Sequence, residues 1–354
     1  MALSSKEESV FDSSLSKSLE AVSFVCPSCR TSLAGSGASG SYHCEVCKKE
    51  YSSCAGVPDF RVIPDAFFSV EEDRKRSEAM LEVIDRFSFT ELLEYYWSLS
   101  DITPPLLRRK FLRSAAMGEH RARRVLSSFQ DGTFKRVVRA RRVLDVGSGN
   151  GNFLVVAAEH YSQVIGIDIG MRHLHVSRRR FMDRGVPIPA LACCCAEYLP
   201  FPDGYFDLIV ISSTLEFARD KDRMLSECAR TLAPGGALYI QTVNRYSISR
   251  DPYAYLWGVG FLPRRSQAAY VRWRRQAVYG HIKTISLREL KRLTARHFTQ
   301  RQIALPDIDI SVLPNFSWTT RLQIRVFKTL RTWPVFRHVF VSLGPGWEIL
   351  LSNG

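Results

Sequence analysis

The sequence predicts an α/β protein built on an open, doubly wound parallel sheet. Short apolar runs read as buried strands at Val143–Val146, Val164–Ile167, Phe206–Val210 and Leu232–Ile240. Helical stretches separate these runs, and that alternation is typical of parallel sheets. The first strand runs into a glycine-rich turn and the second ends in an acid, Asp168. In such sheets ligands bind beyond the carboxyl ends of the strands, so we expect the functional site there.

Composition indicates an ordinary globular chain. Of 354 residues, 45% are hydrophobic and 24% are charged, which excludes fibrous and wholly disordered architectures. No run of about 18 uncharged apolar residues predicts a membrane-spanning helix. Residues 1–22 are rich in Ser and Glu and lack the apolar core of a signal peptide, so we expect them to be disordered and the protein to be cytoplasmic.

Charge is distributed unevenly along the chain. The net charge is −6 for residues 1–100, +9 for 101–142, −2 for 143–244 and +13 for 245–354. A near-neutral core between basic flanks favours contact with phosphate, nucleic acid or an anionic membrane surface. A solvated basic surface without a dedicated partner is the simpler alternative.

Two CxxC pairs near the N-terminus predict a structural zinc site. Cys26 and Cys29 are separated by 14 residues from Cys44 and Cys47. In a chain without an export signal, this spacing favours a tetrahedral four-thiolate zinc site over disulfides. Such a ribbon has almost no core without its metal, and a closed site leaves no position for a substrate. Cys54 is a fifth thiol that we do not expect to be a ligand.

The ribbon resembles a short zinc-binding module found ahead of many bacterial methyltransferases and related to the activator subunit of certain tRNA methyltransferases. The resemblance spans about residues 23–62 and includes Tyr51 and the segment Gly56–Phe60. Residues 63–140 follow as a predicted helical connector. In related enzymes this region forms a wall of the acceptor pocket, although the aromatic side chains of Tyr95, Tyr96 and Trp97 also fit simple packing.

The glycine-rich turn and its neighbouring acids point to a nucleoside cofactor with a positive charge. The turn reads GxGxG over Gly147–Gly151, with Asp145 two residues ahead of it. Glycines there allow close approach of the backbone to a ligand. An acid beside the turn disfavours a pyrophosphate but suits a sulfonium and an amino group. Asp168, at the end of the next strand, is placed to accept hydrogen bonds from ribose hydroxyls.

Residues 141–244 resemble the class I S-adenosylmethionine-dependent methyltransferases of ubiquinone and menaquinone biosynthesis. The resemblance implies a seven-stranded Rossmann-like sheet, with Gly346–Leu351 supplying the final strand. It also implies that S-adenosylmethionine is the cofactor. The implied cofactor-binding residues are Asp145, Gly147, Ser148, Gly149, Asn150, Gly151, Asp168, Ile169, Cys195, Ala196, Glu197 and Ser212.

One departure from that family concerns adenine recognition. The family usually carries Asp where this chain has Cys195, and a thiol is a poorer acceptor for the adenine amino group. Cys193, Cys194 and Cys195 are consecutive, which also raises the possibility of a metal or redox site. Successive residues of an extended segment point in opposite directions, so three adjacent thiols do not face one ion.

The acceptor side is expected after the fourth and fifth strands. A base is needed only if the acceptor is a hydroxyl or a protonated amine. His281 matches a position where the family often has a His and is the first candidate base, with Glu216 the second; a lone His is more often structural. Residues 245–285 form an aromatic, arginine-flanked insertion that fits a lid, a membrane-interface surface or plain packing.

The predicted organisation therefore has six parts: a disordered N-terminus (1–22), a zinc ribbon (23–62), a helical connector and acceptor-pocket wall (63–140), a cofactor-binding core (141–244), a lid insertion (245–285) and the C-terminal part of the fold (286–354). The favoured function is O-methylation of a small or lipid-linked hydroxylated acceptor, with peripheral contact to an anionic membrane. Methylation of ribosomal RNA is an alternative, although the ribbon is acidic and no amino-group methylation motif follows the fourth strand. A catalytically inactive partner protein is a second alternative. The oligomeric state is not predicted.

Overall fold

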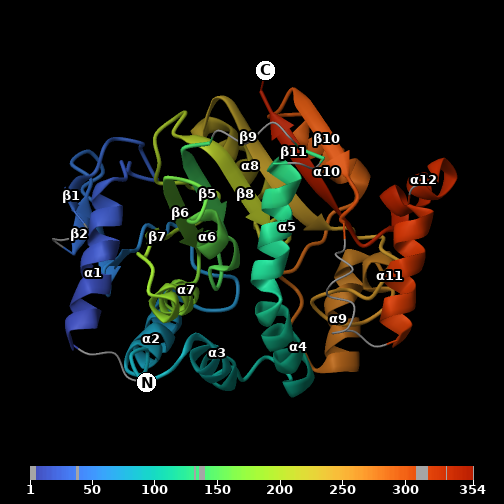
Figure 1. Ribbon diagram of the computed structural model, residues 1–354, viewed down its shortest axis with the longest axis horizontal. Coiled ribbons are helices and arrows are strands. Elements are labelled where there is room, and N and C mark those ends of the chain that lie inside the picture. The colour runs from blue at the N-terminus through green and yellow to red at the C-terminus, as the bar shows by residue number, and fades with distance from the viewer. Residues whose placement is uncertain are drawn as a thin grey trace.

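A seven-stranded mixed sheet forms the centre of the protein in the computed structural model, which describes residues 5–36, 40–130, 133–134, 140–307, 318–331 and 333–353 (Figure 1). The strand order is β10-β11-β9-β8-β5-β6-β7. The strands are β5 (Arg142–Val146), β6 (Gln163–Asp168), β7 (Ala190–Cys193), β8 (Phe206–Ser212), β9 (Leu232–Val243), β10 (Gln300–Ala304) and β11 (Gly346–Ser352). The five strands from β5 to β9 are parallel, whereas β11 runs antiparallel to both its neighbours. The predicted fold class, including the final strand, is confirmed.

The chain reverses its direction across the sheet at β5, which creates the crevice where a ligand binds in such folds. β5 pairs with β6 on one side and with β8 on the other. Helices α5 (Gly118–Gln130), α6 (Asn152–Ala157) and α7 (Met171–Arg184) contact one another in one group, and α8 (Lys221–Thr231) and α10 (Leu287–Thr294) form a second. The strands are buried apolar runs because helices cover them.

The N-terminal ribbon lies beside β7 at the edge of the sheet (Figure 1). It contains β1 (Ala34–Ser36), β2 (Ser41–His43), β3 (Glu50–Cys54) and β4 (Val57–Pro58). Phe24, Tyr42, Tyr51 and Phe60 pack ring against ring and continue into Phe201 of the core. The ribbon therefore shares one hydrophobic core with the sheet.

The prediction of a disordered N-terminal segment, 1–22, is wrong from Ser5 onward, and its first four residues lie outside the described part of the chain. Ser5–Glu20 form the helix α1, and Leu15 and Leu19 are buried in the main core. The Ser18 hydroxyl also donates to the Ile188 carbonyl at 2.8 Å. The composition is rich in Ser and Glu, but Leu15 and Leu19 lie one helical turn apart on the same face. Their burial packs this helix against β7.

Residues 63–140 contain α2 (Val70–Leu81), α3 (Phe89–Ser98) and α4 (Pro105–Ala116), which lie below the sheet in Figure 1, and then α5, which runs upward at the level of the strands. Capping boxes start α2 and α3, in which Ser69 pairs with Glu72 and Ser88 pairs with Glu91. Ser286 and Glu289 start α10 in the same way. These local signals fix where the helices begin, and packing of α2 and α3 against α7 fixes where they lie.

The insertion and the C-terminal region form the part of the molecule drawn at the right of Figure 1. They include the 3-10 helix η2 (Val259–Phe261), α9 (Arg264–Arg275), α11 (Trp318–Leu330) and α12 (Pro334–Leu343). A separate apolar cluster joins Leu107 of α4 to Val259, Val271 and Ile282. Among the residues that the structure describes, no helix is both long and apolar enough to cross a lipid bilayer.

Candidate functional site

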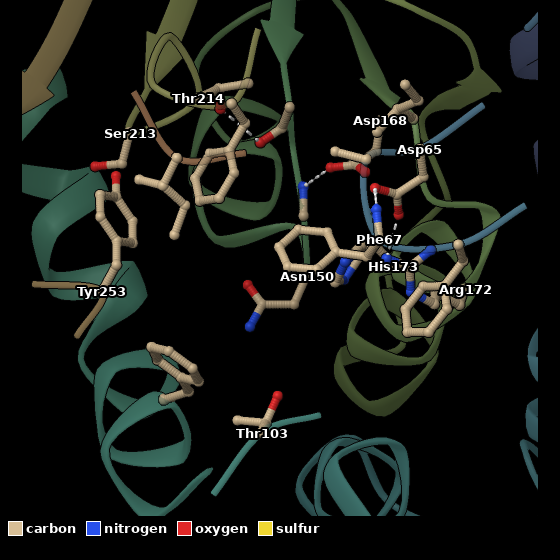
Figure 2. A pocket seen from close by; sticks show the side chains of 18 of the residues that line it. Asp65, Phe67, Thr103, Asn150, Asp168, Arg172, His173, Ser213, Thr214 and Tyr253 are labelled. Atoms are coloured by element: carbon tan, nitrogen blue, oxygen red, sulfur yellow. Dashed lines mark hydrogen bonds and ion pairs between the residues drawn. The ribbon is translucent and has the colours of Figure 1, made fainter. Parts of the chain in front are cut away.

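A cavity of about 500 Å³ opens where the parallel strands end. Its floor comes from the last residues of three strands, Val146 of β5, Asp168 of β6 and Ser212 of β8. Side chains from α3, α4, α7 and the loop 63–68 form its walls (Figure 2). The cavity therefore occupies the switch point that the strand order predicts.

The glycine-rich turn after β5 is shaped by backbone geometry that side chains would prevent. Gly147, Gly149 and Gly151 all have positive φ angles, between 54° and 75°. A Cβ at Gly147 would clash with Thr214, and one at Gly151 would clash with Ser177. At Gly149 a Cβ would meet no protein atom within 3.9 Å, so the space above it is open to a ligand.

Asp168 holds its carboxylate at the edge of this turn. One carboxylate oxygen accepts from the Gly149 N–H at 2.9 Å and the other accepts from the Gly170 N–H at 2.8 Å. Figure 2 shows the Asp168 side chain directed toward the turn at the cavity wall. Each carboxylate oxygen accepts one backbone hydrogen bond and keeps a free lone pair. The two hydroxyls of a vicinal diol could donate to these lone pairs.

Asp145 lies beneath the turn and does not line the cavity. Its side chain is 2% exposed within β5. Burial, together with the nearby Asp168 charge, raises the pKa of Asp145 to about 8. The carboxyl group is therefore mainly protonated at pH 7, and a cation bound above it would favour its ionised form.

The loop after β7 presents a different cysteine from the one expected. Cys194 lines the cavity, whereas the Cys195 thiol points to Ile63, donating to its carbonyl at 3.2 Å and accepting from its N–H at 3.4 Å. The Cys193 thiol donates to the Ile169 carbonyl at 3.4 Å. The three thiols thus face different partners. Burial raises the pKa of each, which keeps them protonated.

The segment leaving the ribbon lines the cavity and begins the region 63–140, which was expected to be a helical connector and acceptor-pocket wall, but residues 63–68 are not helical. Phe60 donates its N–H to the Cys193 carbonyl at 2.7 Å, which extends the sheet edge. Downstream, Ile63, Asp65, Phe67 and Phe68 line the cavity. Glycine and acid motifs drew attention to the core, and no local pattern marks residues 63–68 as part of a site.

Buried ion pairs fix this wall to α7. Arg172 bonds Asp65 at 2.5 Å and also pairs with Asp73 of α2. Arg61 bonds Asp59 at 2.5 Å and Asp73 at 2.7 Å, and it donates to the Ile169 carbonyl at 3.2 Å. Figure 2 shows Asp65 and Arg172 next to Asp168. Because buried charges need partners, these ion pairs fix the position of the wall, which the conformational preferences of the loop alone would not do.

The far end of the cavity is mainly aromatic and aliphatic. Tyr96, Trp97 and Phe111 line it from α3 and α4, and Phe217, Tyr253 and Ile282 line it from the opposite side. The Tyr253 hydroxyl is buried and has no hydrogen-bond partner among the described residues. Ser213, which adopts a positive φ of 56°, is nearby in Figure 2. Strained backbone of this kind is often found at functional sites.

Neither proposed base lines the cavity. Glu216 is fully buried, and its carboxylate accepts from Thr242 at 2.8 Å and from the Val243 N–H at 2.6 Å. His281 lies behind the cavity-lining Phe67, with ring centroids 3.8 Å apart. Burial lowers the pKa of His281, so its imidazole is neutral at pH 7.

The cavity brings together most of the predicted cofactor residues. Those that line it are Gly147, Gly149, Asn150, Asp168, Ile169, Ala196, Glu197 and Ser212. The remaining four, Asp145, Ser148, Gly151 and Cys195, lie behind that surface and shape it. Glu197, for example, accepts from the Arg219 N–H at 2.9 Å and so holds the loop after β8.

The four cysteines of the ribbon converge on one point. The Sγ atoms of Cys26, Cys29, Cys44 and Cys47 all lie within 4.8 Å of one another. Each pair sits in a tight turn closed by a residue with positive φ, Arg30 or Lys48. A hydrogen bond with Thr31 lowers the pKa of Cys29 to about 6, which favours the thiolate. The separation suits four sulfur atoms at about 2.3 Å from a central zinc ion.

Comparison with known proteins agrees with this architecture. Residues 144–240 match a family described as a methyltransferase domain. The ubiquinone/menaquinone biosynthesis C-methyltransferase UbiE of Cupriavidus pinatubonensis is 38% identical over 102 residues, covering 28% of this chain and 42% of that protein. UbiE of Bordetella avium is 39% identical over 119 residues, covering 33% and 46%.

Among solved structures, phosphoethanolamine N-methyltransferase 2 of Haemonchus contortus is 17% identical, with a TM-score of 0.44, over 77% of this chain and 60% of that one. The matched part of this chain spans less than half the length of the two UbiE relatives. These matches support a class I S-adenosylmethionine-dependent methyltransferase core over the matched residues.

Proposed function

We propose that this chain transfers a methyl group from S-adenosylmethionine to an apolar, hydroxylated acceptor, either a small molecule or one linked to a lipid. The observation that carries this proposal is one continuous cavity with two different ends. The glycine-rich turn and Asp168 form one end, and aromatic side chains form the other. The names of the UbiE relatives are consistent with a quinone-like ring as the acceptor.

The cofactor supplies a methyl group already activated by a sulfonium, so the protein mainly has to align the acceptor and exclude water. With the cofactor bound, Asp168 would accept hydrogen bonds from the ribose hydroxyls, and the turn at Gly149 would leave room for the methionyl part against the backbone. A cation bound above the turn would favour ionisation of Asp145. The carboxyl group would then release its proton to solvent and supply a negative charge beneath the turn. Ala196 and Glu197, in the loop after β7, would border the space occupied by the adenine.

Methylation at oxygen is the finer part of the proposal. An acceptor hydroxyl can bond the unpartnered Tyr253 hydroxyl, which lies at the aromatic end. We propose His281 as the group that takes the proton, because its Nε2 is buried without a partner in the described part of the chain. That role requires Phe67 to move aside. If His281→Gln leaves the turnover and its pH profile unchanged, the role is refuted.

We also propose that the four-cysteine cluster binds zinc and that the metal has a structural role. A closed set of four thiolates leaves no coordination position for a substrate. Metal analysis of protein purified under reducing conditions tests this point, with one zinc per chain expected. Absence of zinc would contradict it.

Peripheral contact with an anionic membrane is the remaining part of the proposal. Trp257 and Trp273 are 58% and 75% exposed, and Arg250 and Arg274 stack on their rings. Interfacial surfaces combine such aromatic side chains with basic ones. Binding to vesicles of phosphatidylcholine with about one-third phosphatidylglycerol should fall severalfold in Trp273→Ala. Val46→Ala, an exposed apolar control on the ribbon, should bind as the parent does. Equal loss of vesicle binding in both variants would contradict a membrane-binding role for the surface around Trp257 and Trp273.

The activity itself is tested by calorimetry and labelling. We expect S-adenosylmethionine to bind the full chain, and Asp168→Ala to weaken that binding at least tenfold, or about 1.4 kcal/mol. Asp203→Ala, which removes an exposed carboxylate, is the matched control. Labelled methyl donor incubated with separate lipid, small-metabolite and RNA fractions identifies the acceptor class. Label confined to RNA would overturn the proposal.

A further inference from the structure

A second cavity, of about 380 Å³, adjoins the first beside α5 and the start of the insertion. The two cavities share Ser114, Arg121 and Ser213 in their linings. Four arginines line the second cavity: Arg121, Arg124, Arg245 and Arg250. They come from two distant parts of the sequence, the basic stretch 101–142 and the beginning of the basic stretch 245–354.

Three of these arginines have no carboxylate partner among the described residues. Arg121 donates to the Ser114 carbonyl at 2.7 Å, and Arg245 donates to the Gly260 carbonyl at 3.0 Å. Arg250 stacks on the rings of Tyr255 and Trp257, at 4.7 and 4.6 Å. Backbone and ring contacts orient a guanidinium without neutralising it, so its positive charge remains available.

The acids of the same cavity are already occupied. The Asp251 carboxylate accepts from the N–H groups of Tyr253 and Ala254 and from the Tyr279 hydroxyl at 2.6 Å. Asp307 pairs with Arg331 at 2.7 Å. Arg124 is the one cavity arginine with a described carboxylate partner, Glu348 at 2.8 Å. The lining thus keeps an excess of positive charge in a concave site.

The shape of the cavity depends on glycines that leave no room for a side chain. A Cβ at Gly260 would clash with the Arg245 carbonyl. Gly258 adopts a φ of 76°, which a side chain would strain. The close approach of Gly260 therefore fixes the backbone around Arg245, and the Arg245 guanidinium is held by the Gly260 and Leu262 carbonyls.

We propose that this second cavity binds a phosphate-type anionic group of the acceptor, while the apolar part of the same molecule occupies the aromatic end of the first cavity. The proposal rests on the proposed function and narrows its acceptor to an anionic amphiphile. Arginine forks suit phosphate and carboxylate oxygens in bidentate geometry. The shared Arg121 and Ser213 mark the junction at which the two parts of such a molecule meet.

The test compares three probes on the full chain by calorimetry: geranyl phosphate, geraniol and inorganic phosphate. We expect geranyl phosphate to bind at least tenfold more tightly than either of the others, and this preference to decline as salt is added. Arg121→Gln and Arg250→Gln should each reduce the preference over geraniol at least threefold. Arg272→Gln, which removes the same charge from an exposed position of α9, should leave it unchanged.

Three outcomes would overturn the inference. Geranyl phosphate and geraniol could bind equally, Arg272→Gln could have the effect of the cavity variants, or inorganic phosphate could bind as tightly as geranyl phosphate. S-adenosylmethionine affinity, measured on every variant, reports whether each one is folded. Loss of that affinity in the parent chain would refute the proposed function itself, whereas intact affinity with no phosphate preference would refute the anionic subsite alone.

Discussion

Asp145 offers a test in which stability and cofactor binding should move in opposite directions. Its carboxyl group is 2% exposed, and burial raises its pKa to about 8, against about 3.9 for an unfolded chain. The folded state therefore holds a proton that the unfolded state releases between pH 4 and pH 8. Stability falls as pH rises through that interval, because the unfolded chain then binds fewer protons than the folded one.

The size of the effect follows from the same shift. Asp145→Asn keeps the shape but has no proton to hold, so the variant should be more stable by about 4 kcal/mol at pH 7 and by less than about 1 kcal/mol at pH 4. Between pH 5.5 and pH 7.5 the difference between parent and variant should grow by about 2.5 kcal/mol. Urea unfolding followed by circular dichroism at several pH values measures it.

The same substitution removes the charge that a bound cation would favour, so S-adenosylmethionine affinity should decrease at least tenfold even though the fold is stabilised. Asp101→Asn, at an exposed position, should change stability by no more than about 0.5 kcal/mol at any of these pH values. A stability difference that does not vary with pH would refute the argument that burial controls the Asp145 proton.

Three further predictions concern the walls of the first cavity. Gly147→Ala should weaken S-adenosylmethionine binding at least tenfold, because its Cβ would displace Thr214 and strain a φ of 72°; unchanged affinity in calorimetry would contradict this. Arg172→Gln should lower the free energy of unfolding by about 3–5 kcal/mol in denaturant titrations, because Asp65 and Asp73 would stay buried without their cationic partner. The control Arg265→Gln, at the surface, should lower it by less than about 0.5 kcal/mol. Chelation of the ribbon metal should reduce S-adenosylmethionine affinity at least tenfold, and re-addition of zinc should restore it; an unaffected affinity would show that the wall at 63–68 holds without the metal.

The ribbon and the core are coupled in the structure, which determines what loss of the metal should do. A zinc ribbon ahead of a core suggests two independent units, so metal loss would unfold one and spare the other. The structure joins them instead, through the shared aromatic core and the hydrogen bond from Phe60 to Cys193. The ribbon thereby positions the segment that forms part of the cavity wall.

Local sequence was sufficient to predict the features that depend on residues close together in the chain. The turn at Gly147–Gly151, the acid at Asp168 and the CxxC pairs depend on spacing along a few residues, and each folds as expected. The open α/β sheet could also be predicted from the alternation of strands and helices, and the resemblance to a known family implied its seven strands. The helix at Ser5–Glu20 was missed because its burial depends on β7 and the residues just before it, at least 170 residues further along the chain.

Only the tertiary structure decided which side chains share a cavity. Asp65 and Arg172 are 107 residues apart, and Arg121 and Arg250 are separated by still more of the chain. It also turned the Cys195 thiol toward Ile63 and placed Cys194 in the cavity lining, whereas the sequence had implied Cys195 as the cofactor-binding residue. Such contacts arise from packing between elements, and packing is set by the shapes and charges of the whole fold. Residue type and spacing fixed the chemistry available to this protein, and burial and long-range contacts determined where that chemistry is presented.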